Sequence, residues 1–494
     1  MWPAPPLARR RSSRANTTHP HPLAARAART DTLGMTTHWT LRRALAALAV
    51  AAAAPQHARA QERAQEYRAA DSSPIADSAQ TARAAYREAA AAYRRGDLAA
   101  ARASMRHAAE AWPGQQVYVY NAAALAARAA DTADALRWLA RYADLGAGRD
   151  LSADSSFRPI AGAPGYAALA RRVRDNAAPW ARSTLAFAVD DSTFHAEGIA
   201  FDPAGGGGGR WFLGSVRQRR IVAVDRDGRA SDFVPAGGST LAGVFGLAVD
   251  ATRRTLWAAT SALERMEGYT AADRGRAGVV AYDLGTGRLV RQLWLRPDSA
   301  EHVFGDLALA PNGDVYVSDS RTGVLYVARA GRDSLERFAA HPLLRSPQGM
   351  AFAADGRGMY VADYSHGLLR VDLATGGVRP VPAPDGATTL GIDGLYRRDA
   401  RTLLGVQNGV TPPRVVALCL DPRGERVTRV LLLDRNLAAA DEPTLGVLAR
   451  DAFYYVATSA WEKYDDAGRR VPGTTLRPVS VLRLPLERDA CGAR

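Results

Sequence analysis

The chain has 494 residues, a formal net charge of +14 and 47% hydrophobic residues, which allows a large core and more than one folded module. The positive charge does not indicate a nucleic-acid partner. Residues 1–60 hold nine arginines and one acid, and the remainder shows no basic cluster interleaved with aromatic residues. The two cysteines, Cys419 and Cys491, are too few for a disulfide framework, and the sequence leaves open whether they pair.

Residues 1–60 are predicted to be a leader. Residues 1–34 are rich in Arg, Pro and Ser, which predicts disorder or a start codon assigned upstream of Met35. After Met35, a basic pair precedes the apolar run ALAALAVAAAA, and the small-x-small pattern ARA precedes Gln61. The run is too short for a permanent membrane span. We therefore expect a signal peptide, a mature chain from Gln61 exported to a periplasmic or extracellular compartment, and no stable membrane insertion after cleavage.

The region 61–180 is predicted to be all-α. It is rich in Ala and Arg, and AYRRGDLAAA at 92–101 aligns with AARAADTADA at 126–135 at an offset of 34 residues. Each turn lies between helix-forming segments, so the region resembles tetratricopeptide repeats in period and helix–turn–helix pattern. The later segment SSFRPIAGAPGYAALARRV is similar to a capping helix. The resemblance implies a groove for a protein partner. The alternative is a helical spacer that packs on the next domain.

Residues 183–487 are predicted to form a β-propeller. A short phrase of alternating apolar residues recurs six times, beginning at Gly198, Gly246, Asp306, Gly349, Gly394 and Leu445. A second and a third alternating run follow each copy, with turns such as PNGD and ADGR between them. Strands this short cannot each bury a face alone, and six copies of a four-stranded unit indicate a six-bladed propeller. The predicted fold class is mostly β with an N-terminal all-α segment.

The last copy of the repeat has no room for a fourth strand, because only a short polar tail follows VSVLRLP. An unassigned strand, TLAFAVD at 184–190, precedes the first copy. We predict that this strand completes the last blade and joins the two ends of the ring, which removes a long unpaired edge.

The residue before each innermost strand is expected to point toward the propeller axis. Aligning the six phrases places these residues at equivalent positions: Glu197, Phe245, Gly305, Gln348, Asp393 and Thr444. Two carboxylates, an amide oxygen and a hydroxyl around one axis form an oxygen-rich site of the kind that calcium, magnesium or manganese prefers. The alternative is that Glu197 and Asp393 only accept hydrogen bonds from loop amides.

Four segments of the repeat region read EGIAFD, FGDLALAPNGDVYVSDS, PQGMAFAADGRGMYVADYSHGLLRVD and IDGLYRR. They resemble the regucalcin, gluconolactonase and luciferin-regenerating-enzyme family over roughly residues 185–485. The resemblance implies a six-bladed propeller with one divalent cation at the channel mouth. Its ligands would be Glu197, Gln348 and Asp393, and Asp393 would also serve as the base for the attacking water.

Two departures from the family pattern bear on the substrate. Gln348 stands where the family has asparagine, so the amide oxygen is one methylene further out. The family's substrate-binding Arg-x-Asn-Asp phrase is here Val303-Phe304-Gly305-Asp306, in which only Asp306 remains. A metal centre is therefore better supported than specificity for a sugar lactone.

Two functions follow from these patterns. The first is an exported metal-dependent hydrolase of a small-molecule lactone or ester, with calcium as the first choice of cation and manganese, magnesium or zinc as alternatives. Asp393 or Asp306 would accept the proton of the attacking water. The second is a noncatalytic exported scaffold that binds a protein partner through the helical repeats and the propeller face. The sequence also resembles the NHL and strictosidine-synthase-like propellers, some of which bind without catalysis.

Several other residues are weaker candidates. His195 and His302 lie beside the expected site and could move protons near neutral pH. Asp319 and Asp363 end second strands, where a carboxylate usually accepts hydrogen bonds from the amides of the following turn. Trp461, with Tyr464, is expected in a loop over the channel.

Overall fold

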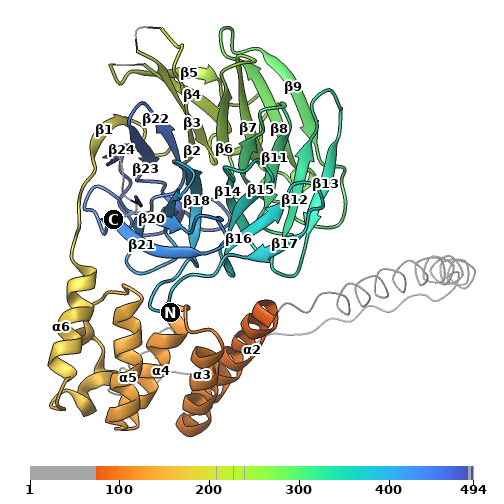
Figure 1. Ribbon diagram of the computed structural model, residues 1–494. Coiled ribbons are helices and arrows are strands. Elements are labelled where there is room, and N and C mark those ends of the chain that lie inside the picture. The colour runs from red at the N-terminus through yellow and green to blue at the C-terminus, as the bar shows by residue number, and fades with distance from the viewer. Residues whose placement is uncertain (1–73, 207, 226, 239, 488–490, 493–494) are drawn as a thin grey trace, which may run out of the picture. The chain divides into compact units, whose positions relative to one another are not determined.

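The computed structural model describes residues 74–206, 208–225, 227–238, 240–487 and 491–492 (Figure 1). The expected leader, its cleavage site and the mature start at Gln61 lie outside the described residues. Within the described ranges, no helix combines the length and the apolar character needed to cross a membrane.

An N-terminal helical segment precedes the sheets. It consists of α2 (Pro74–Arg94), α3 (Leu98–Ala111), α4 (Gln116–Arg128), α5 (Thr132–Asp144), the 3-10 helices η1 (Leu151–Ala153) and η2 (Ser155–Ile160), and α6 (Tyr166–Ala177). The two aligned turns end in equivalent N-caps. Asp97 accepts a hydrogen bond from the Ala100 N–H at the start of α3, and Asp131 accepts one from the Asp134 N–H at the start of α5. The likeness to tetratricopeptide repeats stays a prediction.

The strands form six separate four-stranded antiparallel sheets, which confirms the predicted six-bladed propeller (Figure 1). Blades 1 to 3 contain β2 (Ala196–Asp202), β3 (Arg210–Ser215), β4 (Arg220–Val224) and β5 (Ala230–Val234); β6 (Gly243–Asp250), β7 (Thr255–Ser261), β8 (Ala277–Asp283) and β9 (Leu289–Trp294); and β10 (Phe304–Leu309), β11 (Val315–Asp319), β12 (Val324–Ala328) and β13 (Leu335–Ala340). A short 3-10 helix, η3 (Ala271–Asp273), lies between β7 and β8.

Blades 4 to 6 repeat this order and then close the ring. They contain β14 (Pro347–Phe352), β15 (Gly358–Asp363), β16 (Gly367–Asp372) and β17 (Val378–Pro380); β18 (Ile392–Arg397), β19 (Thr402–Gln407), β20 (Arg414–Leu420) and β21 (Val427–Arg435); and β22 (Gly446–Ala449), β23 (Ala452–Val456), β24 (Val479–Pro485) and β1 (Thr184–Val189). The 3-10 helix η4 (Trp461–Lys463) lies in the long connection between β23 and β24.

Closure of the ring occurs as predicted. Strand β1 pairs antiparallel with β24, with Val189 opposite Val479, so the earliest strand completes the last blade. Apolar side chains fill the seam between the last and first blades, where Val481 of β24 belongs to the same buried cluster as Leu213 of β3. The edge that an open ring would expose is therefore paired.

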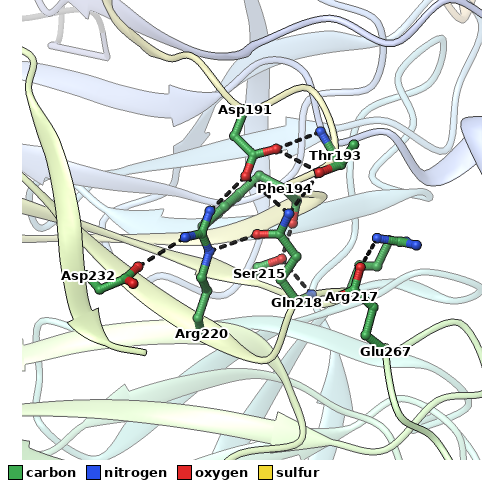
Figure 2. A network of polar contacts seen from close by, with 9 residues as sticks. All are labelled: Asp191, Thr193, Phe194, Ser215, Arg217, Gln218, Arg220, Asp232 and Glu267. Atoms are coloured by element: carbon green, nitrogen blue, oxygen red, sulfur yellow. Dashed lines mark hydrogen bonds and ion pairs between the residues drawn. The ribbon is translucent and has the colours of Figure 1, made fainter. Parts of the chain in front are cut away.

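A polar network ties the closing strand to the first blade, as Figure 2 shows. Asp191, just after β1, accepts hydrogen bonds from Thr193, from Gln218 Nε2 at 3.1 Å and from Arg220 Nη2 at 2.7 Å. Arg220 of β4 also pairs with Asp232 of β5 at 3.0 Å. Burial alone would raise the pKa of Asp191, but the hydrogen bonds from Thr193 and Gln218 and the charge of Arg220 hold it below its usual value. The network fixes the connection between blade 6 and blade 1.

The glycine that recurs in the repeated phrase has a packing role. A Cβ added at Gly198 would lie 2.1 Å from the carbonyl oxygen of Phe245 on the next blade. At Gly349 it would lie 2.3 Å from the backbone nitrogen of Leu395. Inner strands of neighbouring blades thus approach too closely for any side chain at these positions. Close packing around the channel accounts for the recurrence.

The helical segment is hydrogen-bonded to blade 5. Gln116 Oε1, at the start of α4, accepts a hydrogen bond from the Thr411 N–H at 2.8 Å. Buried Arg414 of β20 donates to Gln407 Oε1 at 2.6 Å and to the Leu145 carbonyl oxygen at 3.2 Å, at the C-terminus of α5. These contacts hold the ends of α4 and α5 against the propeller.

The pairing of the cysteines, which the sequence left open, is settled by the fold. Cys419 in β20 and Cys491 near the C-terminus form a disulfide across a sequence separation of 72 residues. The bond attaches the tail that follows β24 to blade 5.

Candidate functional site

A cavity of about 230 Å³ opens at the end of the channel where the inner strands begin. Five of the six positions aligned from the sequence line it, together with residues from neighbouring loops: Glu197, Phe245, Val303, Gly305, Ser320, Gln348, Tyr364, Asp393, Asn408, Glu442 and Trp461. The sixth position, Thr444, is fully buried beside it and donates from Oγ1 to the Glu197 carbonyl oxygen at 3.0 Å. The three predicted metal ligands therefore lie in one cavity.

A break in strand register explains why these side chains face the cavity. The pairing of inner and second strands is irregular between Ala196 and Ile199, between Pro347 and Met350, and between Ile392 and Leu395. The intervals contain Glu197, Gln348 and Asp393 respectively. A β-bulge re-aims a side chain that regular pairing would direct to one face of the sheet. The same irregularity recurs in blades 2 and 3, so it belongs to the repeat.

Two buried carboxylates are each held by one hydrogen bond. Glu197 Oε2 accepts from Trp461 Nε1 at 2.6 Å, and Asp393 Oδ2 accepts from Asn408 Nδ2 at 2.8 Å. Burial and the charge of Asp393 raise the pKa of Glu197 well above its usual value. Burial raises the pKa of Asp393 to about 6, against the opposing hydrogen bond from Asn408. Each carboxylate keeps a second oxygen that accepts no hydrogen bond from the described residues.

Glu442 is a third acid in this cavity, and the sequence analysis missed it. Burial, with the nearby charges of Glu462 and Asp393, raises its pKa to about 7. Its Oε2 is buried and has no hydrogen-bond partner among the described residues. Glu442 lies in the loop before β22, outside the repeated phrase, so no periodic signal marks it. Its presence adds negative charge to a site already rich in carboxylates.

Three further lining residues, Ser320, Tyr364 and Asn408, occupy equivalent positions in the repeat, so the sequence could have indicated them. Each directly follows the second strand of its blade, after β11, β15 and β19 respectively. The second strand runs antiparallel to the inner strand, so its end lies beside the inner strand's beginning. Tyr364 Oη donates to Asn408 Oδ1 at 3.0 Å, and Asn408 in turn holds Asp393. Extending the register argument to these positions would have found them.

The residues present fit a divalent cation by donor chemistry. Gln348 Nε2 donates to Ser346 Oγ at 3.2 Å, which leaves its amide oxygen as a ligand. That oxygen would lie 3.0 Å from a Cβ at Gly305, so the glycine makes room for it. With the second oxygens of Glu197 and Asp393 it completes a hard donor set. Among the described residues, no cluster of three or more His, Cys, Asp or Glu side chains has metal-binding geometry; this set has two carboxylates and an amide.

The second catalytic candidate, Asp306, lies in a different part of the channel. It lines a cavity of about 390 Å³ bounded by the inner strands β2, β6, β10, β14, β18 and β22. Its Oδ1 accepts from the Leu307 N–H at 2.8 Å. Burial, reinforced by the charge of Asp393, raises the pKa of Asp306 to about 8 despite that hydrogen bond. The structure thus separates Asp306 from the cavity that holds the three expected ligands.

Neither histidine candidate lines the channel-mouth cavity. His195 is buried in the left-handed region at φ 50°, edge-on to Trp461 with ring centroids 4.6 Å apart. Burial, and then the charges of Arg265 and Arg217, lower the pKa of His195 to about 3, so it stays neutral near pH 7. His302 is bound by Asp319 at 2.6 Å and by Asp298 at 3.0 Å.

The remaining candidates have the structural roles expected of them. Asp319 accepts hydrogen bonds from the backbone N–H groups of Val303, Arg321 and Thr322. Asp363 accepts four, from Arg345, Ser346, Ser365 and His366. Trp461 does cover the channel mouth, since it lines the cavity and binds Glu197.

Comparisons with known proteins found similarity to solved structures alone. No protein-family model and no curated protein matches the chain. Among solved structures, a gluconolactonase of Xanthomonas campestris is similar at 16% identity and a TM-score of 0.41, over 62% of this chain and 94% of that one. A PQQ-bound aldose sugar dehydrogenase of Streptomyces coelicolor is similar at 15% identity and 0.41, over 63% and 100%. Virginiamycin B lyase of Staphylococcus aureus matches at 9% identity and 0.41, over 61% and 98%.

Likeness this remote carries no argument about chemistry. One fold supports many functions. Function must therefore be argued from the residues of the cavity.

Proposed function

We propose that the protein is a divalent-cation-dependent hydrolase that acts on an ester or lactone at the channel-mouth cavity. The observation that carries the proposal is the convergence of Glu197, Gln348 and Asp393, each with an uncommitted oxygen, on one cavity. Three acids with raised pKa values share that cavity with no lysine or arginine among its lining residues. A cation from solution would relieve their mutual repulsion.

The chain's own residues would orient and activate the reactants. A divalent cation held by Glu197, Gln348 and Asp393 would polarise the substrate carbonyl and stabilise the developing negative charge on its oxygen. Trp461 fixes the orientation of Glu197, and Asn408 fixes that of Asp393. With a pKa of about 6, Asp393 is ionised near pH 7 and would accept the proton from the attacking water. Asp306 is the weaker base, because its pKa of about 8 keeps it protonated there.

The resemblance to the regucalcin and gluconolactonase family supports this assignment and also limits it. The family's arginine and asparagine are replaced by Val303 and Gly305, which line the cavity. These two residues offer no side-chain hydrogen bond to a polyhydroxylated ring. We therefore propose a substrate with fewer hydroxyl groups than a sugar lactone.

Export to an oxidising compartment is part of the proposal. The predicted signal peptide before Gln61 and the Cys419–Cys491 disulfide agree with it, because disulfides persist mainly in secreted and periplasmic proteins. The helical repeats would then be available to a protein partner outside the cytoplasm.

A noncatalytic exported scaffold is the second candidate. The loss of the family's substrate-binding arginine and asparagine at Val303 and Gly305 favours it. In that case the cavity would hold a structural ion, and the recognition surfaces would be the propeller face and the helices.

The test measures metal binding and turnover separately. Elemental analysis of the purified mature protein, and thermal shifts with calcium, manganese, magnesium, zinc and a chelator, report the ion. A panel of lactones and aryl esters reports the chemistry, with exposed Asp451→Asn as the control variant. A metal response without any turnover would favour the scaffold, and turnover that survives complete removal of metal would overturn the hydrolase proposal.

A further inference from the structure

A third cavity, of about 160 Å³, lies between the helical segment and blades 4 and 5. One wall includes Arg83 of α2, Trp112 at the end of α3 and Tyr118 of α4, and Tyr364 with its neighbours forms another. We propose that this chamber, here named the helix-side chamber, binds a carboxylate group. If the proposed hydrolase function holds, on which this extension rests, the substrate is an ester or lactone that carries a carboxylate away from the reacting carbonyl.

Arg83 supplies the positive charge, and its partner within the fold is neutral. His366 Nδ1 lies 2.8 Å from the Leu343 carbonyl oxygen, so that nitrogen carries the proton. His366 Nε2 is then left as the acceptor for Arg83 Nη1 at 3.3 Å. Burial lowers the pKa of His366, which keeps the ring neutral. The contact positions the guanidinium without neutralising it.

No carboxylate of the described residues forms an ion pair with Arg83. The acid whose charge reaches it is Asp363, but four backbone N–H groups already bind the oxygens of Asp363. Burial, and then the charge of Arg345, lower the pKa of Arg83, with a smaller contribution from Arg87. A half-buried cation beside other cations is a site where an anion from solution is stabilised.

The other walls suit a carboxylate attached to a flat apolar body. Trp112 stands edge-on to His366 with ring centroids 6.1 Å apart, and Tyr118 stacks on Tyr86 with ring centroids 5.0 Å apart. The side chains of Gln115 and Ser365 line the chamber and make no hydrogen bond within the described ranges. Aromatic walls beside a guanidinium favour an organic carboxylate over a strongly hydrated inorganic ion.

Tyr364 lies between the chamber and the channel mouth, because it lines both cavities. A Cβ at Gly409 would lie 2.5 Å from Tyr364 Cζ, so glycine leaves room for the ring beside the backbone. Tyr364 also donates to Asn408, which holds Asp393. A substrate with its carbonyl beside Asp393 and its carboxylate beside Arg83 would pass the Tyr364 ring.

Binding is tested first, independently of catalysis. Benzoate is titrated by calorimetry into the Asp393→Asn variant with chelator present, so that no cation in the channel mouth can hold the probe. Benzamide serves as the neutral isostere. We expect benzoate to bind about tenfold or more tightly than benzamide, and Arg83→Gln to abolish that preference. Arg83→Lys should restore part of it.

The matched control is Arg94→Gln, an exposed arginine on the same helix, and it should leave benzoate affinity within about twofold. Equal affinity for benzoate in the Arg83→Gln and parent proteins, with unchanged thermal midpoints, would overturn the proposal that the helix-side chamber binds a carboxylate. So would the absence of any preference over benzamide.

The substrate class is then tested with two aryl esters that differ only in a distal carboxylate or carboxamide. Arg83→Gln should raise KM about tenfold for the carboxylate ester and leave its kcat unchanged. For the carboxamide ester, neither KM nor kcat should change. An equal effect on both esters would refute the proposed substrate class. If neither ester is hydrolysed by any variant while benzoate binding still requires Arg83, the hydrolase proposal fails, but the proposal that the chamber binds a carboxylate is retained.

Discussion

The two cavities on either side of Tyr364 differ in the sign of their charge. The channel mouth holds Glu197, Asp393 and Glu442 and no basic lining residue, whereas the helix-side chamber is lined by Arg83 and no acid. In both cavities, burial and like charges disfavour the charged form: they raise the pKa of Glu197 and lower the pKa of Arg83. A fold that buries charge of one sign without an internal partner leaves a place for a ligand of the other sign. The difference therefore predicts a cation in one cavity and an anion in the other.

The largest effect is expected when the channel mouth loses one carboxylate, because this reduces the excess negative charge that distinguishes it from the helix-side chamber. We expect Glu197→Gln or Asp393→Asn to lower turnover by about 1,000-fold, because one ligand charge disappears and, for Asp393, the base as well. The thermal shift with added cation should disappear in the same variants. Steady-state kinetics and a metal titration measure both effects.

Asp451→Asn, which changes an exposed acid of the last blade, is the control for these substitutions and should retain activity and metal response. A Glu197→Gln protein with an undiminished thermal shift would show that the cation binds elsewhere.

The second prediction concerns how much the contact between the helical segment and blade 5 contributes to the free energy of unfolding. Arg414→Leu would leave Gln407 Oε1 without a donor and the Leu145 carbonyl oxygen with only the long hydrogen bond from Gln116 Nε2 at 3.5 Å. We expect a loss of roughly 4 kcal/mol in the free energy of unfolding, since each hydrogen bond from a charged group contributes about 1.5–3 kcal/mol. Denaturant unfolding measures the loss, and the benzoate affinity of the helix-side chamber should fall with it.

Arg423→Leu removes an exposed arginine near the same sheet and is the matched control. If Arg414→Leu and Arg423→Leu unfold at the same denaturant concentration, the helical segment does not depend on this contact.

The third prediction uses the pKa of Asp306. Its folded-state pKa of about 8 lies above the unfolded value, so the stability it contributes is complete below about pH 4 and is lost as pH rises toward 8. For the cation-free protein the loss from this group approaches about 1.4 kcal/mol per pH unit. Asp306→Asn cannot ionise and should flatten that part of the profile, by about 3 kcal/mol between pH 5 and pH 7.

The measurement is the difference in unfolding free energy between Asp306→Asn and the parent at each pH, which cancels the other titrating acids to first order. Two parallel profiles would mean that Asp306 does not hold its proton in the folded protein.

The smallest expected effect comes from the residue that separates the cavities. Tyr364→Phe removes the hydroxyl that orients Asn408 while the ring remains, and we expect a cost of about 1 kcal/mol, or roughly fivefold in turnover. Tyr360→Phe, on the strand that precedes Tyr364, is the control, because its hydroxyl donates to the Gly424 carbonyl oxygen in the β20–β21 turn of blade 5, outside both cavities. Equal turnover in the two variants would remove Tyr364 from the network around Asp393.

Much of the propeller could be predicted because each blade repeats one pattern. The aligned position placed Glu197, Gln348 and Asp393 at equivalent points; the structure has each as the second residue of its inner strand and brings the three into one cavity. The same pattern did not place Asp306 with them, since it lies one residue beyond the irregular register and lines the channel instead. Glu442 was not found, because it lies two residues before the aligned position of its blade, outside the repeated phrase.

The sequence by itself determined the number of blades, the closing role of β1 and two of the three acids at the channel mouth, Glu197 and Asp393. All of these follow from short-range periodicity, which fixes strand register and therefore side-chain direction. Only the tertiary structure decided that Arg83 would meet His366, 283 positions later, and that the cysteines would pair. Contacts between segments that share no repeat depend on how whole elements pack, and no local pattern encodes them.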